Sequence, residues 1–123
     1  MKTKGQIEAE ISEAIIRFEK EFMGRGPAMT RTYLVDDLVI VRLQEVITRA
    51  EYHLADFGED DRGRDLVKQT RMQLLEKARP LLEAAIHTVT GITVKSLHTD
   101  LSTRTGERLI VFTLSEKPAC ATE

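Results

Sequence analysis

The chain has 123 residues, 18 basic and 20 acidic side chains, and a formal net charge of −2. This length predicts one domain, residues 1–116, with a flexible C-terminal tail at 117–123, and the charge gives no global signal for binding nucleic acid or anionic membranes. The single cysteine, Cys120, excludes an intramolecular disulfide and favours a reducing compartment. No segment approaches the roughly 18 apolar residues of a membrane span, and no signal peptide is evident, so we expect a soluble cytoplasmic protein.

Near the N-terminus, apolar residues recur every three or four positions, which predicts an amphipathic helix. Thr3 and Gln6 match a capping box at its start, and Gly24 with Pro27 predicts its end. The apolar stripe consists of Ile7, Ile11, Ala14, Ile15, Phe18 and Phe22.

The apolar period then changes to two over Arg31–Val35 and Leu38–Leu43. This change predicts a β-hairpin that turns at Asp36 and Asp37. The second strand is apolar on nearly both faces, so we expect it inside the sheet.

A short helix is predicted from Arg49 to about Phe57, with Thr48 as its N-cap and Glu51 at its third position. Ile47 and Tyr52 occupy the two positions of a hydrophobic staple. The segment 58–63 is interpreted either as a solvated loop or as the frayed start of the next helix.

A long helix is predicted over Asp65–Val89 and ends at Gly91. Pro80 removes a helical hydrogen bond at about 3 kcal/mol, so the helix either kinks near Ala78 or stops there. Its unbroken stripe favours the kink. The stripe consists of Leu66, Val67, Thr70, Leu74, Leu75, Ala78, Leu81, Leu82, Ala85, Ile86 and Val89.

A second hairpin is predicted from Ile92–Leu101 and Arg108–Leu114, with a long polar turn at 102–107. The apolar alternation changes phase between Val94 and Leu97, which predicts a β-bulge near Ser96.

The helix and hairpin pattern therefore occurs twice. It predicts an α+β fold in which two helix-hairpin (αββ) units form a four-stranded antiparallel sheet with helices packed on one face. We expect Leu38–Leu43 and Leu109–Leu114 in the middle of the sheet. These strands carry apolar residues for both faces, so we expect a second copy to cover the open face in a homodimer.

The second hairpin carries the most varied polar residues. His98, Asp100 and Ser102 share one face of a regular strand, where they could supply metal ligands or a base with its orienting group. Glu107 is a further candidate in this metal-binding or enzymatic alternative. A polar edge strand entering a turn is the interpretation that we favour.

Two other groups have a structural and a functional interpretation. The acidic run Asp56, Glu59, Asp60, Asp61 and Asp65 could attract a divalent cation, but it lacks the order of a calcium loop, and a solvated helix start is favoured. Nucleic-acid binding is disfavoured because only Tyr33 offers a stacking surface. The arginines considered for RNA binding around the first hairpin are Arg25, Arg31, Arg42 and Arg49.

The sequence contains no nucleophile elbow, phosphate-binding Walker loop, zinc-binding cysteine pair or HExxH helix. We therefore assign no catalytic residue, no metal ligand and no cofactor, and we favour a protein that is not an enzyme.

Several stretches resemble a bacterial family of unknown function that is labelled MpsC-like, after a sodium-translocating, membrane-potential-generating system. The most distinctive stretch is Asp100–Arg108, and the resemblance spans most of the chain. It implies a soluble partner of a membrane ion-transport system and supplies no catalytic or ligand residues. The resembling stretches are Glu19–Pro27, Asp37–Leu43, Ala78–Pro80, Thr90–Gly91 and His98–Leu114.

The leading hypothesis is a non-enzymatic accessory or regulatory module that binds a protein partner or a small ligand through the second hairpin and the glycine-arginine link. The candidate binding residues are His98, Asp100, Ser102, Arg104, Thr105, Glu107, Arg108 and Arg25.

Overall fold

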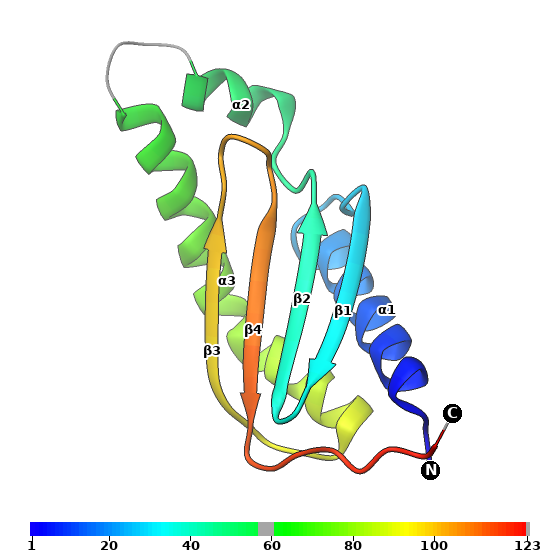
Figure 1. Ribbon diagram of the computed structural model, residues 1–123. Helices are drawn as coiled ribbons and strands as arrows, with labels where there is room; N and C mark the ends of the chain where they lie inside the picture. The colour runs from blue at the N-terminus through cyan, green and yellow to red at the C-terminus, as the bar shows by residue number, and fades with distance from the viewer. Residues whose placement is uncertain (57–60, 123) are drawn as a thin grey trace.

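A computed structural model describes residues 1–56 and 61–122. Figure 1 shows one twisted sheet with two long helices packed on the same face. The elements in chain order are α1 (Lys4–Phe22), β1 (Met29–Val35), β2 (Leu38–Gln44), α2 (Arg49–Asp56), α3 (Arg62–Thr90), β3 (Val94–Leu101) and β4 (Arg108–Leu114).

The four strands pair antiparallel in the order β1-β2-β4-β3. The two hairpins therefore meet at β2 and β4, which are the most apolar strands and lie in the middle as predicted. The predicted α+β fold is confirmed, because α1 and α3 cover one face of this sheet (Figure 1).

Local signals set the starts of α1 and α2 and the end of α3 as the sequence predicts. The Gln6 amide donates to Thr3 Oγ1 at 3.1 Å, and the Thr3 amide donates to Gln6 Oε1 at 2.8 Å. Thr48 and Glu51 form the same reciprocal pair at the start of α2, at 3.2 and 2.8 Å. Gly91 ends α3 with a φ of 73°, a left-handed conformation that costs glycine little.

The helix α3 continues through Pro80 from Arg62 to Thr90, so the alternative in which it stops near Ala78 is wrong. It also begins before the predicted Asp65. Arg62 and Gly63 are helical, so the loop interpretation of this part of the segment is wrong. Residues 58–60 of that segment lie outside the described residues. The predicted end of the preceding helix at Phe57 lies outside them as well.

The core lies between the two helices and the helix-covered sheet face. The predicted stripe of α3 is wider than the surface that the sheet covers, since Leu66 and Leu81 are 53% and 58% exposed. The predicted bulge is confirmed: Val94 pairs with Leu114 and Ser96 with Thr113, which leaves Lys95 as the extra residue. Fully buried core residues include Ile11, Ile15, Val39, Val41, Leu43, Leu75, Leu82, Ile86, Ile110 and Phe112.

The flexible tail at 117–123 stays a prediction. Over its described residues the chain returns toward the N-terminus (Figure 1), where the Ala121 amide donates to the Lys2 carbonyl at 2.9 Å. Thr3 and Ala121 form an isolated parallel bridge.

Gly106 packs the turn between β3 and β4 against α2. Its φ is 75°, and a Cβ atom there would collide with the Tyr52 hydroxyl. Gly24 has a similar φ of 83° but faces open space. Comparing substitutions at the two glycines therefore distinguishes the cost of the left-handed backbone from the cost of the close contact with Tyr52.

Replacing Gly106 by alanine should destabilise the chain more than replacing Gly24. The left-handed backbone costs about 1–2 kcal/mol at either site, and the Gly106→Ala variant must also displace Tyr52, for a total of about 3 kcal/mol. Urea unfolding measures both variants, and adding Tyr52→Phe should restore part of the loss only in Gly106→Ala. Equal losses for the two glycine variants would contradict the proposed close packing.

Candidate functional site

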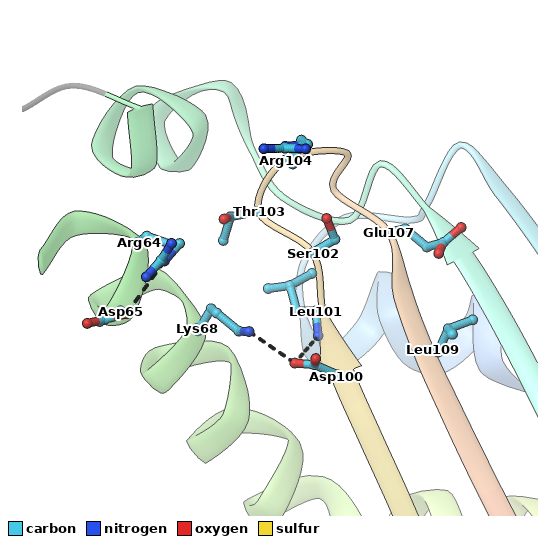
Figure 2. Close-up of a pocket in the computed structure, with 10 residues that line it drawn as sticks. All are labelled: Arg64, Asp65, Lys68, Asp100, Leu101, Ser102, Thr103, Arg104, Glu107 and Leu109. Carbon is cyan, nitrogen blue, oxygen red and sulfur yellow. Dashed lines mark hydrogen bonds and ion pairs between the residues drawn. The ribbon is translucent and has the colours of Figure 1, made fainter. Parts of the chain in front are cut away.

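A cleft of about 470 Å³ lies between the N-terminal part of α3 and the turn that joins β3 to β4. Figure 2 shows Lys68 of the helix and Asp100 of the hairpin pointing toward each other across this space. The lining residues are Arg64, Asp65, Lys68, Asp100, Leu101, Ser102, Thr103, Arg104, Glu107 and Leu109.

Asp100 links the two walls of the cleft. Its Oδ1 atom accepts a hydrogen bond from the Leu101 amide at 2.8 Å and lies 3.2 Å from Lys68 Nζ. The backbone hydrogen bond from Leu101, followed by the Lys68 ammonium, lowers the pKa of Asp100. Asp100 is therefore ionised at neutral pH and holds the hairpin against α3.

Most other charges of the cleft are also paired. Arg64 lies 3.1 Å from Asp61 and 3.6 Å from Asp65, and Glu107 Oε2 accepts from Arg42 Nε at 2.6 Å. Arg104 differs from these residues: it is exposed at the tip of the turn, and no described residue forms an ion pair with it. The cleft thus presents one unpaired positive charge.

The turn that carries Arg104 is held by its own hydrogen bonds. The Gly106 amide donates to the Ser102 carbonyl, and the Ser102 amide donates to the Glu107 carbonyl, both at 2.8 Å. The Glu107 amide also donates to Thr105 Oγ1 at 3.3 Å. Ser102 and Thr103 place two hydroxyl groups beside Arg104 (Figure 2).

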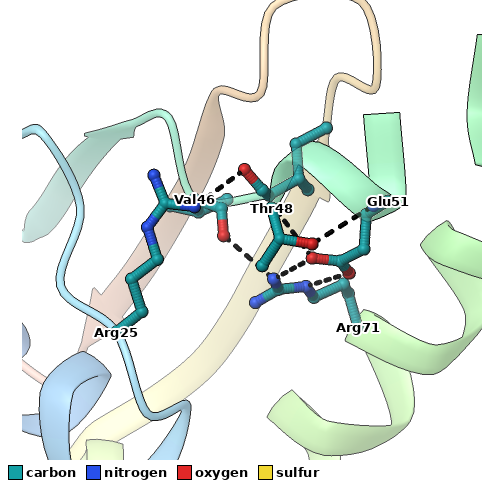
Figure 3. A network of polar contacts seen from close by, with 6 residues as sticks. Arg25, Val46, Thr48, Glu51 and Arg71 are labelled. Carbon is teal, nitrogen blue, oxygen red and sulfur yellow. Dashed lines mark hydrogen bonds and ion pairs between the residues drawn. The ribbon is translucent and has the colours of Figure 1, made fainter. Parts of the chain in front are cut away.

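A second set of contacts ties this turn to α3 through the connection between β2 and α2 (Figure 3). The Val46 amide donates to the Gly106 carbonyl at 2.9 Å, and the Val46 carbonyl accepts from Arg71 at 2.9 Å. Arg71 also donates to both carboxylate oxygens of Glu51, at 2.9 and 2.6 Å. The position of the turn relative to α3 thus depends on Arg71.

Glu51 is ionised because of this contact. Partial burial raises its pKa, but hydrogen bonds from the Arg71 side chain and the Thr48 amide more than offset burial, so the pKa of Glu51 is lowered. The pair is partly buried and bidentate, a geometry in which a guanidinium and a carboxylate bind strongly.

Two more ionisable groups lie inside the core. Glu19 of α1 and Arg108 of β4 are each 2% exposed. Burial raises the pKa of Glu19, an effect that Arg108 and Arg71 oppose, while burial lowers the pKa of Arg108, an effect that Glu19 opposes. Arg108 also donates to Thr99 Oγ1 at 2.9 Å.

The structure brings four of the eight predicted binding residues to the cleft: Asp100, Ser102, Arg104 and Glu107. The other four lie elsewhere. Thr105 is exposed in the turn, His98 is exposed on the open sheet face, and Arg108 is buried. Arg25 donates to the Ile47 carbonyl at 3.3 Å (Figure 3), so it supports the connection between β2 and α2.

The helical wall of the cleft was missed by the sequence analysis. Arg64, Asp65 and Lys68 begin α3 and carry the pattern of a solvated helix start. Only the packing of α3 beside β3 brings Lys68 within ion-pair distance of Asp100. A charge pattern within one helix contains no signal for that contact.

The carboxylates of the metal-binding alternative are held in ion pairs, since Asp100 contacts Lys68 and Glu107 contacts Arg42. Within residues 1–56 and 61–122, no three His, Cys, Asp or Glu side chains are grouped to hold a metal ion. Glu59 and Asp60 of the acidic run lie outside this part of the chain.

Residues 3–116 match the protein family described as "Na+-translocating membrane potential-generating system (MpsC)". The chain is 45% identical over 113 residues to "Uncharacterized protein YbcI" of Bacillus subtilis (strain 168), which covers 92% of this chain and 89% of that protein. No solved structure matches the chain at a significant level. In the described part of the chain, no helix has the length and apolar character required to cross a membrane.

Replacing Glu51 by glutamine should lower the free energy of unfolding by about 1–2 kcal/mol at pH 7, because charge-assisted hydrogen bonds to Arg71 are lost. Since the folded-state pKa of Glu51 is lowered, its stabilisation is present above the ordinary value of 4.5 and is lost as the pH falls through the folded-state pKa. Urea unfolding at pH 7 and pH 3 measures this change. A difference between the two chains that is independent of pH would contradict it.

Glu19→Gln is the matched control because its pH dependence has the opposite sign. The pKa of Glu19 is raised, so its contribution is present below 4.5 and is lost as the pH rises through the folded-state pKa. Acidification should therefore stabilise the unsubstituted chain relative to Glu19→Gln.

Proposed function

The chain belongs to the MpsC family, and from this premise we propose that it is a soluble, cytoplasmic, non-enzymatic accessory module that binds an acidic segment of a protein partner. The partner belongs to the membrane ion-translocating system that the family description names. The binding site is the cleft between α3 and the turn after β3. The module acts as a homodimer.

One observation carries this proposal: Arg104 is the charged residue of the cleft that has no ion-pair partner among the described residues. A guanidinium binds a carboxylate with two parallel hydrogen bonds. The hydroxyl groups of Ser102 and Thr103 can donate to the same carboxylate or to a neighbouring peptide carbonyl. An extended acidic segment satisfies all three groups.

The cleft also favours binding over catalysis. Asp100 is the carboxylate that links the two walls of the cleft, and the Leu101 amide and Lys68 lower its pKa. A general base is most effective when its pKa lies near the working pH, so lowering the pKa of Asp100 makes it a weaker base. The ion pair between Lys68 and Asp100 joins the two walls and serves instead to fix the shape of the cleft.

Photo-crosslinking in cells tests the proposed site. A photoreactive residue in place of Thr103 should form an adduct with a protein of the membrane fraction. Arg104→Glu in the same chain should reduce the adduct at least tenfold, because two carboxylates would then face each other. Lys77→Glu is the matched control, since it changes an exposed residue on α3 outside the cleft by the same charge.

An adduct that forms equally well with Arg104→Glu would overturn the site, and the absence of any membrane-fraction adduct would overturn the partner. Purified variants should show unchanged unfolding midpoints, because Arg104 has no ion pair or side-chain hydrogen bond with the described residues.

A strain that lacks this protein provides a test of the cellular role. We expect the unsubstituted chain and Lys77→Glu to restore the sodium-dependent membrane potential, measured with a potential-sensitive dye. Arg104→Glu should fail to restore it. Full restoration of the membrane potential by Arg104→Glu would show that the ion-transport role does not depend on the cleft.

A further inference from the structure

Within residues 1–56 and 61–122, no helix covers the sheet face opposite α1 and α3, which faces the viewer in Figure 1. The strand register arranges its side chains in three rows that each cross all four strands. In the order β1, β2, β4, β3, the rows are Arg31, Arg42, Leu109 and Asp100; Tyr33, Ile40, Val111 and His98; and Val35, Leu38, Thr113 and Ser96.

The middle of this face is apolar. Ile40 and Val111 are adjacent at its centre and are partly covered by their neighbours. Around them, Tyr33, Val35 and Leu109 are 40%, 48% and 41% exposed. A contiguous apolar surface of this kind marks an interaction site when polar residues surround it.

Opposite charges lie at opposite edges of one row. Arg31 is exposed on β1, and no described residue forms an ion pair with it. Asp100 lies in the same row on β3, and within the described residues its ion pair with Lys68 and its hydrogen bond from the Leu101 amide both use Oδ1. The second carboxylate oxygen of Asp100 is thus available for another cation.

We propose that two copies pack through these faces about a two-fold axis that runs parallel to the strands, between β2 and β4. This inference rests on the dimeric state proposed above. The rotation exchanges the two edges of the sheet and keeps each row in place. Arg31 then faces Asp100 of the partner subunit, Tyr33 faces His98 of the partner subunit, and Ile40 faces Val111 of the partner subunit.

When the strands of the two sheets are aligned, one other two-fold axis in the interface plane is possible, perpendicular to the strands. That axis would place the charged row over the row that begins with Val35. Arg31 would then face Val35 of the partner subunit, and Asp100 would face Ser96 of the partner subunit, so both charges would lose water without gaining an ion pair. Charge complementarity therefore selects the axis parallel to the strands.

The size of the face predicts a reversible dimer. Four strands of about seven residues form a surface of about 19 by 23 Å. The buried surface of about 1,000 Å² in total lies at the lower end of specific protein interfaces. The dimer should therefore dissociate on dilution through the micromolar range.

The dimer also changes the proposed binding site. Asp100 lines the cleft, so pairing with Arg31 of the partner subunit places a second guanidinium at the rim of each cleft. An acidic segment would then meet Arg104 from its own chain and Arg31 of the partner subunit. Dimerisation and partner binding should consequently reinforce each other.

Cysteine cross-linking of the full chain distinguishes the two axes. In a Cys120→Ser background, Tyr33→Cys and His98→Cys are made singly and together, and a short bismaleimide is added. The proposed axis predicts dimer cross-links in the double variant and in a mixture of the two single variants. Neither single variant should cross-link to itself, because its two cysteines lie at opposite edges of the interface.

A self-cross-link of Tyr33→Cys would identify the perpendicular axis and overturn the proposal. Sedimentation velocity from 1 to 200 µM gives the oligomeric state independently. A chain that remains monomeric overturns the interface, and a dimer without the predicted cross-links overturns this geometry alone. The photo-crosslink at Thr103 and its loss in Arg104→Glu are measured separately from the oligomeric state, so failure of the interface and failure of the binding site are distinguishable.

A charge exchange tests the predicted ion pair. Arg31→Glu should weaken the dimer at least tenfold, since two carboxylates would then face each other. Adding Asp100→Arg should restore much of the loss, because the exchanged charges again face each other. Arg49→Glu is the matched control on α2, away from this face, and should leave the dimer unchanged. Failure of the double variant to regain affinity while retaining its unfolding midpoint would overturn the pairing.

Discussion

The rest of the structure depends on charged side chains that are buried where α1, α3 and the sheet meet. Arg71 reaches from α3 to the Val46 carbonyl and to both carboxylate oxygens of Glu51, while Arg108 and Glu19 lie almost fully buried in the same region. Replacing Glu51 leaves the buried Arg71 guanidinium without its charged partner, at the cost of about 1–2 kcal/mol expected for Glu51→Gln. The helices and strands are thus held in one relative position more strictly than apolar contacts alone would require.

This constraint extends to the candidate site. The Val46 carbonyl accepts a hydrogen bond from Arg71, and the Val46 amide donates one to the Gly106 carbonyl. These two hydrogen bonds fix the turn that carries Arg104 relative to α3. The turn closes itself through further backbone hydrogen bonds. A cleft whose two walls are fixed in this way loses little conformational entropy when a ligand binds. The fold therefore offers the proposed partner a preformed surface, in which Arg104 has no ion-pair partner among the described residues.

Particular residues show which features of the structure can be predicted from the sequence. The capping boxes at Thr3 and Thr48 and the bulge at Lys95 follow from local patterns, because each depends on residues a few positions apart. Arg108 was grouped with the binding residues of the turn, yet it shares the parity of Ile110 and Phe112 and points into the core with them. The alternation of apolar residues along β4 therefore contained the signal that Arg108 is buried.

By itself, the sequence determined the helices, the strands, the bulge and the central position of the two most apolar strands. It also identified the second hairpin as the source of Asp100, Ser102, Arg104 and Glu107. Only the tertiary structure decided that Lys68 and Arg64 form the opposite wall, and that Arg31 and Asp100 lie at opposite ends of one row. These contacts and alignments join residues that are distant in sequence. Their geometry follows from the order of the strands and the packing of the helices, which cannot be predicted from the local spacing of apolar residues.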